Sequence, residues 1–138
     1  KDNHAIAQLY EGIKLLIIEI KNSGILLSVF TGKGRTSALI TLDELGLTKY
    51  FDMIVSGDDV EDHKPAPEGI IKFLKKYKLN PSEVLMIGDA PSDIIAAKQA
   101  GVEIASVLWD SYAEEKVREL NGNNIFHSVD ELRSFIFG

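Results

Sequence analysis

The sequence predicts an α/β fold, a Rossmann-like parallel sheet with helices on both faces. Helix-like and strand-like segments alternate along the chain. The strand-like segments are short, continuous apolar runs, the pattern of strands buried on both faces. Such regular alternation indicates parallel strands joined by crossover helices. With 138 residues the chain is long enough for one domain with a sizeable core, and we expect residues 1–138 to form that core domain.

Apolar patterning and turn residues place the individual elements. The strands are expected at residues 25–30, 53–55, 84–87, 104–108 and 125–127. The helices are expected at residues 10–21, 36–45, 67–77, 92–100 and 112–120, with a last helix after the capping-box pattern of residues 128–131. Gly46 and Gly101 end two helices, and Pro67 fits a first helical position. Trp109 follows a strand and is expected to pack at the end of the sheet.

The composition is that of an ordinary globular protein, and it disfavours several function classes. The formal net charge of −6 argues against nucleic acid or an anionic membrane as the main partner, because both favour basic surfaces. There is no cysteine, which excludes disulfides, thiolate metal sites and a cysteine nucleophile. No signal peptide is visible, and the most apolar stretch, residues 13–20, is too short to span a bilayer. We therefore expect a cytoplasmic location.

Three loops follow strand-like runs and should share one edge of the sheet, at residues 31–33, 58–64 and 88–93. In open parallel sheets, ligands bind outside the carboxyl ends of the strands. The first loop offers the Thr31 hydroxyl, the Lys33 ammonium and backbone N–H groups around Gly32, which together suit an anion. Taken alone, it is as compatible with a plain strand-to-helix turn. A P-loop is rejected because Gly34 stands where Ser or Thr should follow the lysine.

The second loop contains Lys64, and the third contains two carboxylates. Pro65 and Pro67 restrict the backbone after Lys64, and a lysine held at a strand end can neutralise a phosphoryl group. A solvated surface lysine is the alternative interpretation. Asp89 comes at the end of an apolar run, and carboxylate oxygens are the ligands that Mg²⁺ prefers. Asp93 enters a helix, where a charge favourable to the helix dipole is the alternative.

Taken in order, residues 28–33, 64–68 and 88–93 resemble the second, third and fourth motifs of the haloacid dehalogenase-like superfamily. The first stretch is an apolar strand ending in Thr, the second is Lys-Pro-Ala-Pro-Glu, and the third is Gly-Asp-Ala-Pro-Ser-Asp. The chain is most similar to the branch of phosphoglycolate phosphatases and β-phosphoglucomutases. The resemblance implies a Mg²⁺-dependent phosphatase core that acts on a small phosphorylated metabolite.

The resemblance also implies a role for each matching residue. Thr31 and the N–H groups beside it would hold the phosphoryl oxygens, and Lys64 would neutralise the charge of that group and of the nucleophile. Asp89 would ligate Mg²⁺, and Asp93 would orient Lys64 or bind the water shell of the metal. The implied catalytic set is Thr31, Lys64 and Asp93, the phosphate-binding set Thr31, Gly32, Lys33 and Lys64, and the metal set Asp89 and Asp93.

One family element has no counterpart in the sequence. The superfamily attacks phosphate with the first Asp of an Asp-x-Asp-x-Thr/Val motif at the end of an N-terminal strand, forming an aspartyl phosphate. The early carboxylates Asp2, Glu11 and Glu19 do not follow a strand in that way. We therefore expect a fragment without the nucleophile strand and the cap domain, inactive or nearly so alone. The strands ending at Phe30 and Ile87 should then pair directly or borrow a strand by self-association.

Two other functions remain alternatives. A phosphomutase of the same branch would need an acid/base Asp and a suitable cap. A non-catalytic binding or regulatory module gains support from the missing nucleophile. A dehalogenase is less favoured, because those relatives need no Mg²⁺ whereas Asp89 suits a metal.

Overall fold

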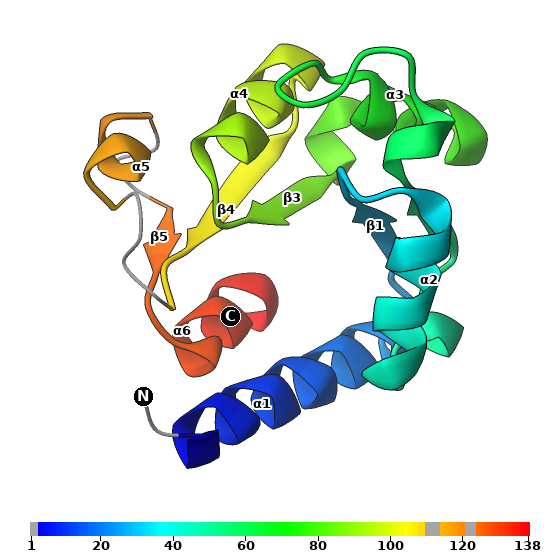
Figure 1. Ribbon diagram of the computed structural model, residues 1–138. Coiled ribbons are helices and arrows are strands. Elements are labelled where there is room, and N and C mark those ends of the chain that lie inside the picture. Colours follow the sequence, from blue (N-terminus) through cyan, green and yellow to red (C-terminus); the bar gives the residue numbers. More distant parts are fainter. Residues whose placement is uncertain (1–2, 110–113, 121–123) are drawn as a thin grey trace.

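The computed structural model describes the backbone of residues 3–109, 114–120 and 124–138, with side chains from residue 11 onward in these ranges. The described residues form parallel strands with helices packed on both faces (Figure 1). This arrangement confirms the predicted α/β class. Among the described helices, none is long and apolar enough to cross a membrane.

Each predicted element is present, with shifts at the boundaries. The strands are β1 (Ser28–Phe30), β2 (Met53–Val55), β3 (Leu85–Gly88), β4 (Glu103–Val107) and β5 (Ile125–Phe126). The helices are α1 (Asn3–Asn22), α2 (Arg35–Glu44), α3 (Glu68–Tyr77), α4 (Pro91–Ala100), α5 (Glu114–Leu120) and α6 (Val129–Phe137). Short 3₁₀ helices lie at η1 (Thr48–Tyr50), η2 (Gly57–Asp59) and η3 (Pro81–Glu83). The predicted start of the fifth helix, at residue 112, lies outside the described residues.

The first strand is shorter than its apolar run predicts. β1 begins at Ser28, whereas the run begins at Ile25, and both Ile25 and Leu26 are exposed. The backbone N–H of Leu27 donates to the Asp52 carboxylate at 2.8 Å and so does not join a ladder of strands. A side chain therefore sets the amino end of β1, which hydrophobic patterning cannot reveal.

The strands form two separate parallel sheets. β1 pairs with β2, with Val29 opposite Ile54, and the second sheet has the order β3-β4-β5, with Met86 opposite Ile104. β1 and β3 are the inner edges of the two sheets and do not hydrogen-bond to each other (Figure 1). No described strand lies between them, which agrees with the prediction that the central strand is missing. Direct pairing of the two strands, one of the two arrangements we expected, is not formed.

Helices that contact both sheets explain why β1 and β3 stay apart. On one face, α1 belongs to a cluster that includes Leu27, just before β1, and Leu85 of β3. On the other face, Ile70 of α3 belongs to the same hydrophobic cluster as Ile94 of α4. Its neighbour Gly69 lies so close to Phe30 that an added Cβ would overlap the phenyl ring. The packing of both helices thus fixes a separation at which the two strands do not pair.

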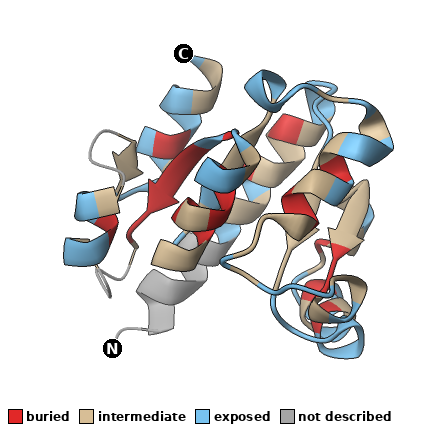
Figure 2. Cartoon of the chain, turned by 90° about the horizontal axis from the view of Figure 1, so that it is seen from above, coloured by how far each residue is buried: buried red, intermediate tan, exposed pale blue. Residues whose placement is uncertain are grey.

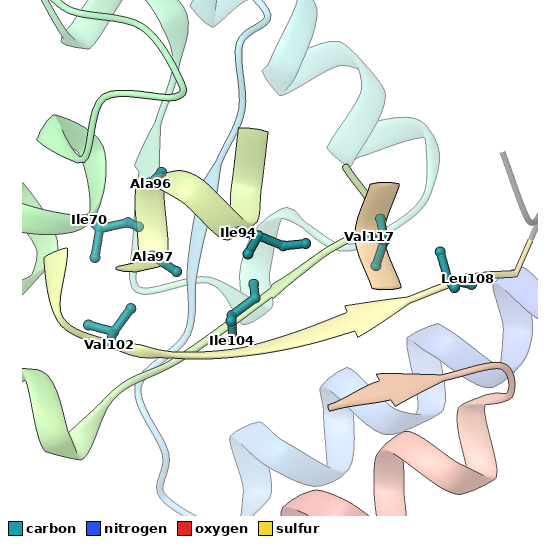
Figure 3. Close-up of a cluster of buried hydrophobic side chains, with 8 residues drawn as sticks. All are labelled: Ile70, Ile94, Ala96, Ala97, Val102, Ile104, Leu108 and Val117. Carbon is teal, nitrogen blue, oxygen red and sulfur yellow. The ribbon is translucent and has the colours of Figure 1, made fainter. Parts of the chain in front are cut away.

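The core lies on both faces of β4, the most buried strand (Figure 2). Ile104 points to one face, and Ala105 and Val107 belong to the cluster on the other, as the two-residue period of a strand requires. Figure 3 shows the first cluster, formed by Ile70, Ile94, Ala96, Ala97, Val102, Ile104, Leu108 and Val117. The second cluster contains Leu16, Ile20, Ala105, Val107 and Leu132, with Trp109 packed against it as predicted. Helices on both faces therefore cover a sheet whose carboxyl edge remains accessible.

Candidate active site

Lys64 connects the two sheets at their carboxyl ends. Its Nζ donates to Asp93 Oδ1 at 2.8 Å and to the carbonyl oxygen of Phe30 at 3.3 Å. The same ammonium lies 4.8 Å from the centroid of the Phe30 ring, a favourable cation–π distance. Phe30 ends β1, and Asp93 lies in the first turn of the helix that follows β3. One side chain therefore spans the two sheets and joins the second and third predicted loops.

The Asp93 carboxylate is buried and engaged at both oxygens. Only 5% of the residue is exposed. Oδ1 accepts from Lys64, and Oδ2 accepts from the backbone N–H groups of Asp89 and Ala90 at 3.2 Å each. Gly88 makes room for this carboxylate, because an added Cβ would overlap the Asp93 side chain. These contacts suit a residue that positions Lys64 better than one that coordinates a metal directly.

Asp89 differs from Asp93 because its carboxylate is exposed and has no partner among the described residues. It follows β3 directly, at the accessible edge of the sheet. The described residues contain no group of three or more His, Asp or Glu side chains that could enclose a metal ion. Mg²⁺ commonly takes only one or two carboxylates and completes its octahedron with water and substrate oxygens. Asp89 fits that sparse pattern as a single protein ligand.

The Thr31 loop lies beside Lys64, since Thr31 directly follows the strand residue that accepts from the ammonium. Thr31 Oγ1 accepts from the backbone N–H of Lys33 at 3.2 Å. Gly32 and Lys33 are exposed, and apart from the two chain neighbours of Gly32 no described residue lies within 4 Å of a Cβ added there. The Lys33 Nζ, however, donates to Thr41 Oγ1 on α2 at 3.3 Å. The structure thus brings together Thr31, Lys64, Asp89 and Asp93, and it directs the ammonium of Lys33 along α2.

Glu68 holds the loop that carries Lys64, a role that was not among those predicted for the three loops. Its carboxylate accepts from the backbone N–H of Asp62 at 2.9 Å and from that of Glu61 at 3.0 Å. These two N–H groups lower the pKa of Glu68 below its usual value, and that of Asp62 has the larger effect. Glu68 begins α3, where the helix dipole also favours a negative charge. An acidic residue directly after Pro67 is the sequence signal that could have predicted this role.

The adjacent acids Asp58 and Asp59 hold the first and second loops together. Asp58 Oδ2 accepts from the backbone N–H of Arg35 at 2.7 Å and caps α2, because Gly34 at the N-cap offers no side chain. Asp59 Oδ2 accepts from Ser56 N at 2.7 Å and from Ser56 Oγ at 2.8 Å. The Ser56 N–H is the main reason why the pKa of Asp59 is lowered. The Ser-x-x-Asp spacing is a capping signal visible in the sequence.

Comparison with known proteins decides the family. The sequence pattern of the family described as haloacid dehalogenase-like hydrolase matches residues 1–107. The chain belongs to the haloacid dehalogenase-like hydrolases. It is 33% identical to pyrophosphatase PpaX of Halalkalibacterium halodurans, over 99% of this chain and 65% of that protein. It is 32% identical to phosphoglycolate phosphatase 1 of Pseudomonas aeruginosa, over 78% of this chain and 40% of that protein.

A solved structure agrees with this membership. A Thermotoga maritima protein, provisionally described as a β-phosphoglucomutase, superposes with a TM-score of 0.82 and 29% identity. The match covers 91% of this chain and 58% of that one. The chain therefore spans between 40% and 65% of the length of these three relatives. The family and the fold expected from the three loops are both confirmed.

Proposed function

We propose that this chain is the core part of a Mg²⁺-dependent phosphatase that hydrolyses a small phosphate ester in the cytoplasm. The observation that carries the proposal is the 2.8 Å contact between Lys64 and Asp93, next to the Asp89 carboxylate, which has no partner among the described residues. Phosphoryl transfer depends mainly on positioning and on neutralising the charge of the phosphoryl oxygens. The pyrophosphatase and phosphatase names of the relatives support a phosphorylated substrate of low mass.

Each side chain would then act in a distinct way. The Lys64 ammonium would neutralise the transferring phosphoryl group, and Asp93 would hold that ammonium in place. The Thr31 hydroxyl and the N–H groups of the following loop would donate to the phosphoryl oxygens. Asp89 would hold Mg²⁺, and Asp93 could contact the water molecules of the metal. When bound, the metal would neutralise further charge on the phosphate.

The attacking carboxylate would come from an Asp-x-Asp-x-Thr/Val segment outside these 138 residues. β1 and β3 leave their inner edges unpaired in the described structure, so a strand placed there would end beside Lys64. Its first Asp would displace the ester oxygen from phosphorus, its second Asp would protonate the leaving oxygen, and water would then hydrolyse the aspartyl phosphate. We propose that the 138-residue chain is inactive or nearly so by itself. A strand borrowed from a second copy is the other way to fill this position.

A phosphomutase is the second candidate, because the Thermotoga maritima structure matches most of the chain. A mutase would return the phosphoryl group to a sugar phosphate instead of passing it to water. The two candidates differ in product, so inorganic phosphate released per substrate consumed distinguishes them. Near-complete release in the protein extended by its upstream segment supports the phosphatase, and an isomerised sugar phosphate without release supports the mutase.

Mg²⁺-dependent phosphate binding tests the site in the chain itself. We expect calorimetric titration with inorganic phosphate to show binding in the presence of Mg²⁺ that weakens about tenfold or more in EDTA, because Asp89 would hold a cation whose charge attracts the anion. Asp89→Asn should remove this dependence on Mg²⁺. Asp130→Asn, an exposed aspartate on α6, makes the same charge change and should leave it intact. Phosphate binding that is equal with Mg²⁺ and with EDTA would contradict the metal assignment and favour a non-catalytic module.

A further inference from the structure

We propose that the outer edge of β2 carries a second anion site, which binds a phosphorylated small molecule of the nucleotide class. An open groove of about 430 Å³ runs along this edge. Its lining includes Arg35 of α2, Lys72 and Lys76 of α3, and the apolar residues Phe51 and Met53. Among the described strands β2 pairs with β1 alone, so the groove lies on the side of β2 opposite to Lys64 and Asp93. The groove therefore does not belong to the candidate active site.

The uncompensated charge of the groove is positive, although the whole chain is acidic. Its two carboxylates are both neutralised, since Asp52 pairs with Lys21 at 2.6 Å and Asp59 pairs with Arg35 at 3.2 Å. Lys72 and Lys76, by contrast, form no ion pair with any described residue. They lie one turn apart on the same face of α3, where two like charges repel each other. An anion between them would relieve that repulsion.

The remaining interactions of these two lysines leave them accessible. Lys76 lies 5.7 Å from the centroid of the Tyr77 ring, a contact that keeps the ammonium exposed. Glu68, one turn before Lys72, attracts its ammonium without forming an ion pair with it, and the Glu68 carboxylate accepts from two backbone N–H groups. Both ammonium groups can therefore turn toward a ligand without breaking an ion pair within the described structure.

Arg35 is held in a position that leaves donors available. Both hydrogen bonds of its guanidinium with described residues use Nη2, which donates to Ile54 O at 3.1 Å and to Asp59 Oδ2 at 3.2 Å. The N–H groups on Nε and Nη1 have no partner among the described residues. A guanidinium fixed by one nitrogen and open at the others suits a phosphate, which it can bind through two parallel hydrogen bonds.

The occupant is a small molecule, because the edge of β2 is closed to another strand. Met53 and Val55 turn their backbone groups toward β1, so the alternate residues face outward. The outward carbonyl of Ile54 accepts from Arg35, that of Asp52 accepts from the Tyr77 hydroxyl at 3.0 Å, and Ser56 N donates to Asp59. An added strand would have to displace these side chains.

The volume of the groove and its apolar lining residues indicate which small molecule fits. A volume of about 430 Å³ lies in the usual range of small-molecule sites, roughly 300 to 1,000 Å³, and accommodates a mononucleotide. Phe51 and Met53, which line the groove, would offer an apolar surface to a flat base. The phosphate would lie against the lysines. A nucleoside monophosphate uses both parts of the groove, whereas inorganic phosphate uses only one.

Titration with AMP in EDTA tests this site without the metal of the candidate active site. We expect saturable binding by calorimetry, with adenosine and inorganic phosphate each binding at least about tenfold more weakly than AMP. Lys72→Glu/Lys76→Glu should weaken AMP binding by about tenfold or more, since two charge-assisted contacts become repulsive. The control Lys49→Glu/Lys75→Glu makes the same charge change on exposed lysines outside the groove and should stay within about twofold.

Amide chemical shifts in the AMP titration locate the ligand. Changes centred on Ile54, Lys72 and Lys76 are expected. Changes centred on Lys64 and Asp89 would overturn the proposal, because they would place AMP at the candidate active site. Equal losses of AMP affinity in the two Lys→Glu double variants would also overturn the proposal. The absence of saturable AMP binding would do the same, provided that the amide spectrum of the wild-type chain is that of a folded protein. Lys72→Gln/Lys76→Gln, which only removes the charges, should give an intermediate affinity while its melting temperature stays near that of wild type.

Discussion

Replacing Lys64 by Met would remove the ammonium while keeping much of the apolar stem that lies against Phe30. The change leaves the Asp93 carboxylate without its cation at a position where the side chain is only 6% exposed. At 2.8 Å and an effective dielectric constant of about 20, the pair has a Coulomb energy of about 6 kcal/mol, much of which desolvation offsets. Breaking a buried pair costs about 3–5 kcal/mol. Because Asp93 keeps two backbone donors, we expect the lower end, about 3 kcal/mol.

A double-mutant cycle separates the pair from its surroundings. Lys64→Met, Asp93→Asn and the double variant would be unfolded in urea at pH 7, with far-UV circular dichroism as the signal. The double variant should be more stable than the sum of the single losses predicts, with a coupling energy of about 2 kcal/mol. The exposed pair Lys116 and Glu119 is the control and should show no measurable coupling. A coupling below about 0.5 kcal/mol for Lys64 and Asp93 would refute the reasoning.

Two further substitutions test the packing around the site. Asp52→Asn should lower the free energy of unfolding at pH 7 by about 1–2 kcal/mol, because the carboxylate accepts from Lys21 and from Leu27 N. The hydrogen bond from Lys21, and after it the one from the Leu27 N–H, lower the pKa of Asp52. The stabilisation that the Asp52 carboxylate provides is therefore present above the ordinary pKa of 3.8 and is lost as the pH falls through the lowered pKa. Urea unfolding at pH 7 and pH 3 should show the difference shrinking. Gly69→Ala should destabilise by about 1–3 kcal/mol in thermal unfolding, since its Cβ overlaps the Phe30 ring.

Each of these two predictions has a clear contrary outcome. A loss for Asp52→Asn that stays the same at both pH values would show that the charge of the carboxylate is not what stabilises the fold. Alanine is the better helix former by about 1 kcal/mol, so propensity alone predicts that Gly69→Ala stabilises the protein. A rise in melting temperature would therefore contradict the close packing of α3 on β1.

The position of the candidate site could be predicted because it depends on strand ends. A parallel sheet brings the residues after its strands to one edge, and this rule needs only the order of apolar runs and turns. Thr31 and Asp89 follow directly from it, and two prolines marked Lys64 in the loop between them. The absence of the first motif likewise predicted that a central strand would be missing.

Contacts between segments distant in sequence could not be predicted. The bond from Lys64 to the Phe30 carbonyl depends on how α3 packs against β1, and the amino end of β1 depends on the Asp52 side chain. The direction of Lys33 depends on which acceptor on α2 lies nearest. Direct pairing of β1 with β3 appeared possible from backbone hydrogen bonding alone. Helix packing on both faces of the sheets keeps β1 and β3 apart. The pattern of apolar residues along the sequence does not reveal how the helices pack.

Because Lys64 contacts both sheets, the charge of the candidate site depends on whether the two sheets are docked together. The Lys64 ammonium reaches Asp93 only when the last carbonyl of one sheet and the first helical turn after the other are docked together. A molecule whose halves have not yet come together would present the carboxylates of Asp89 and Asp93 without that cation and would repel phosphate. If the site binds phosphate as proposed, affinity for the anion would therefore depend on the docking of the two sheets.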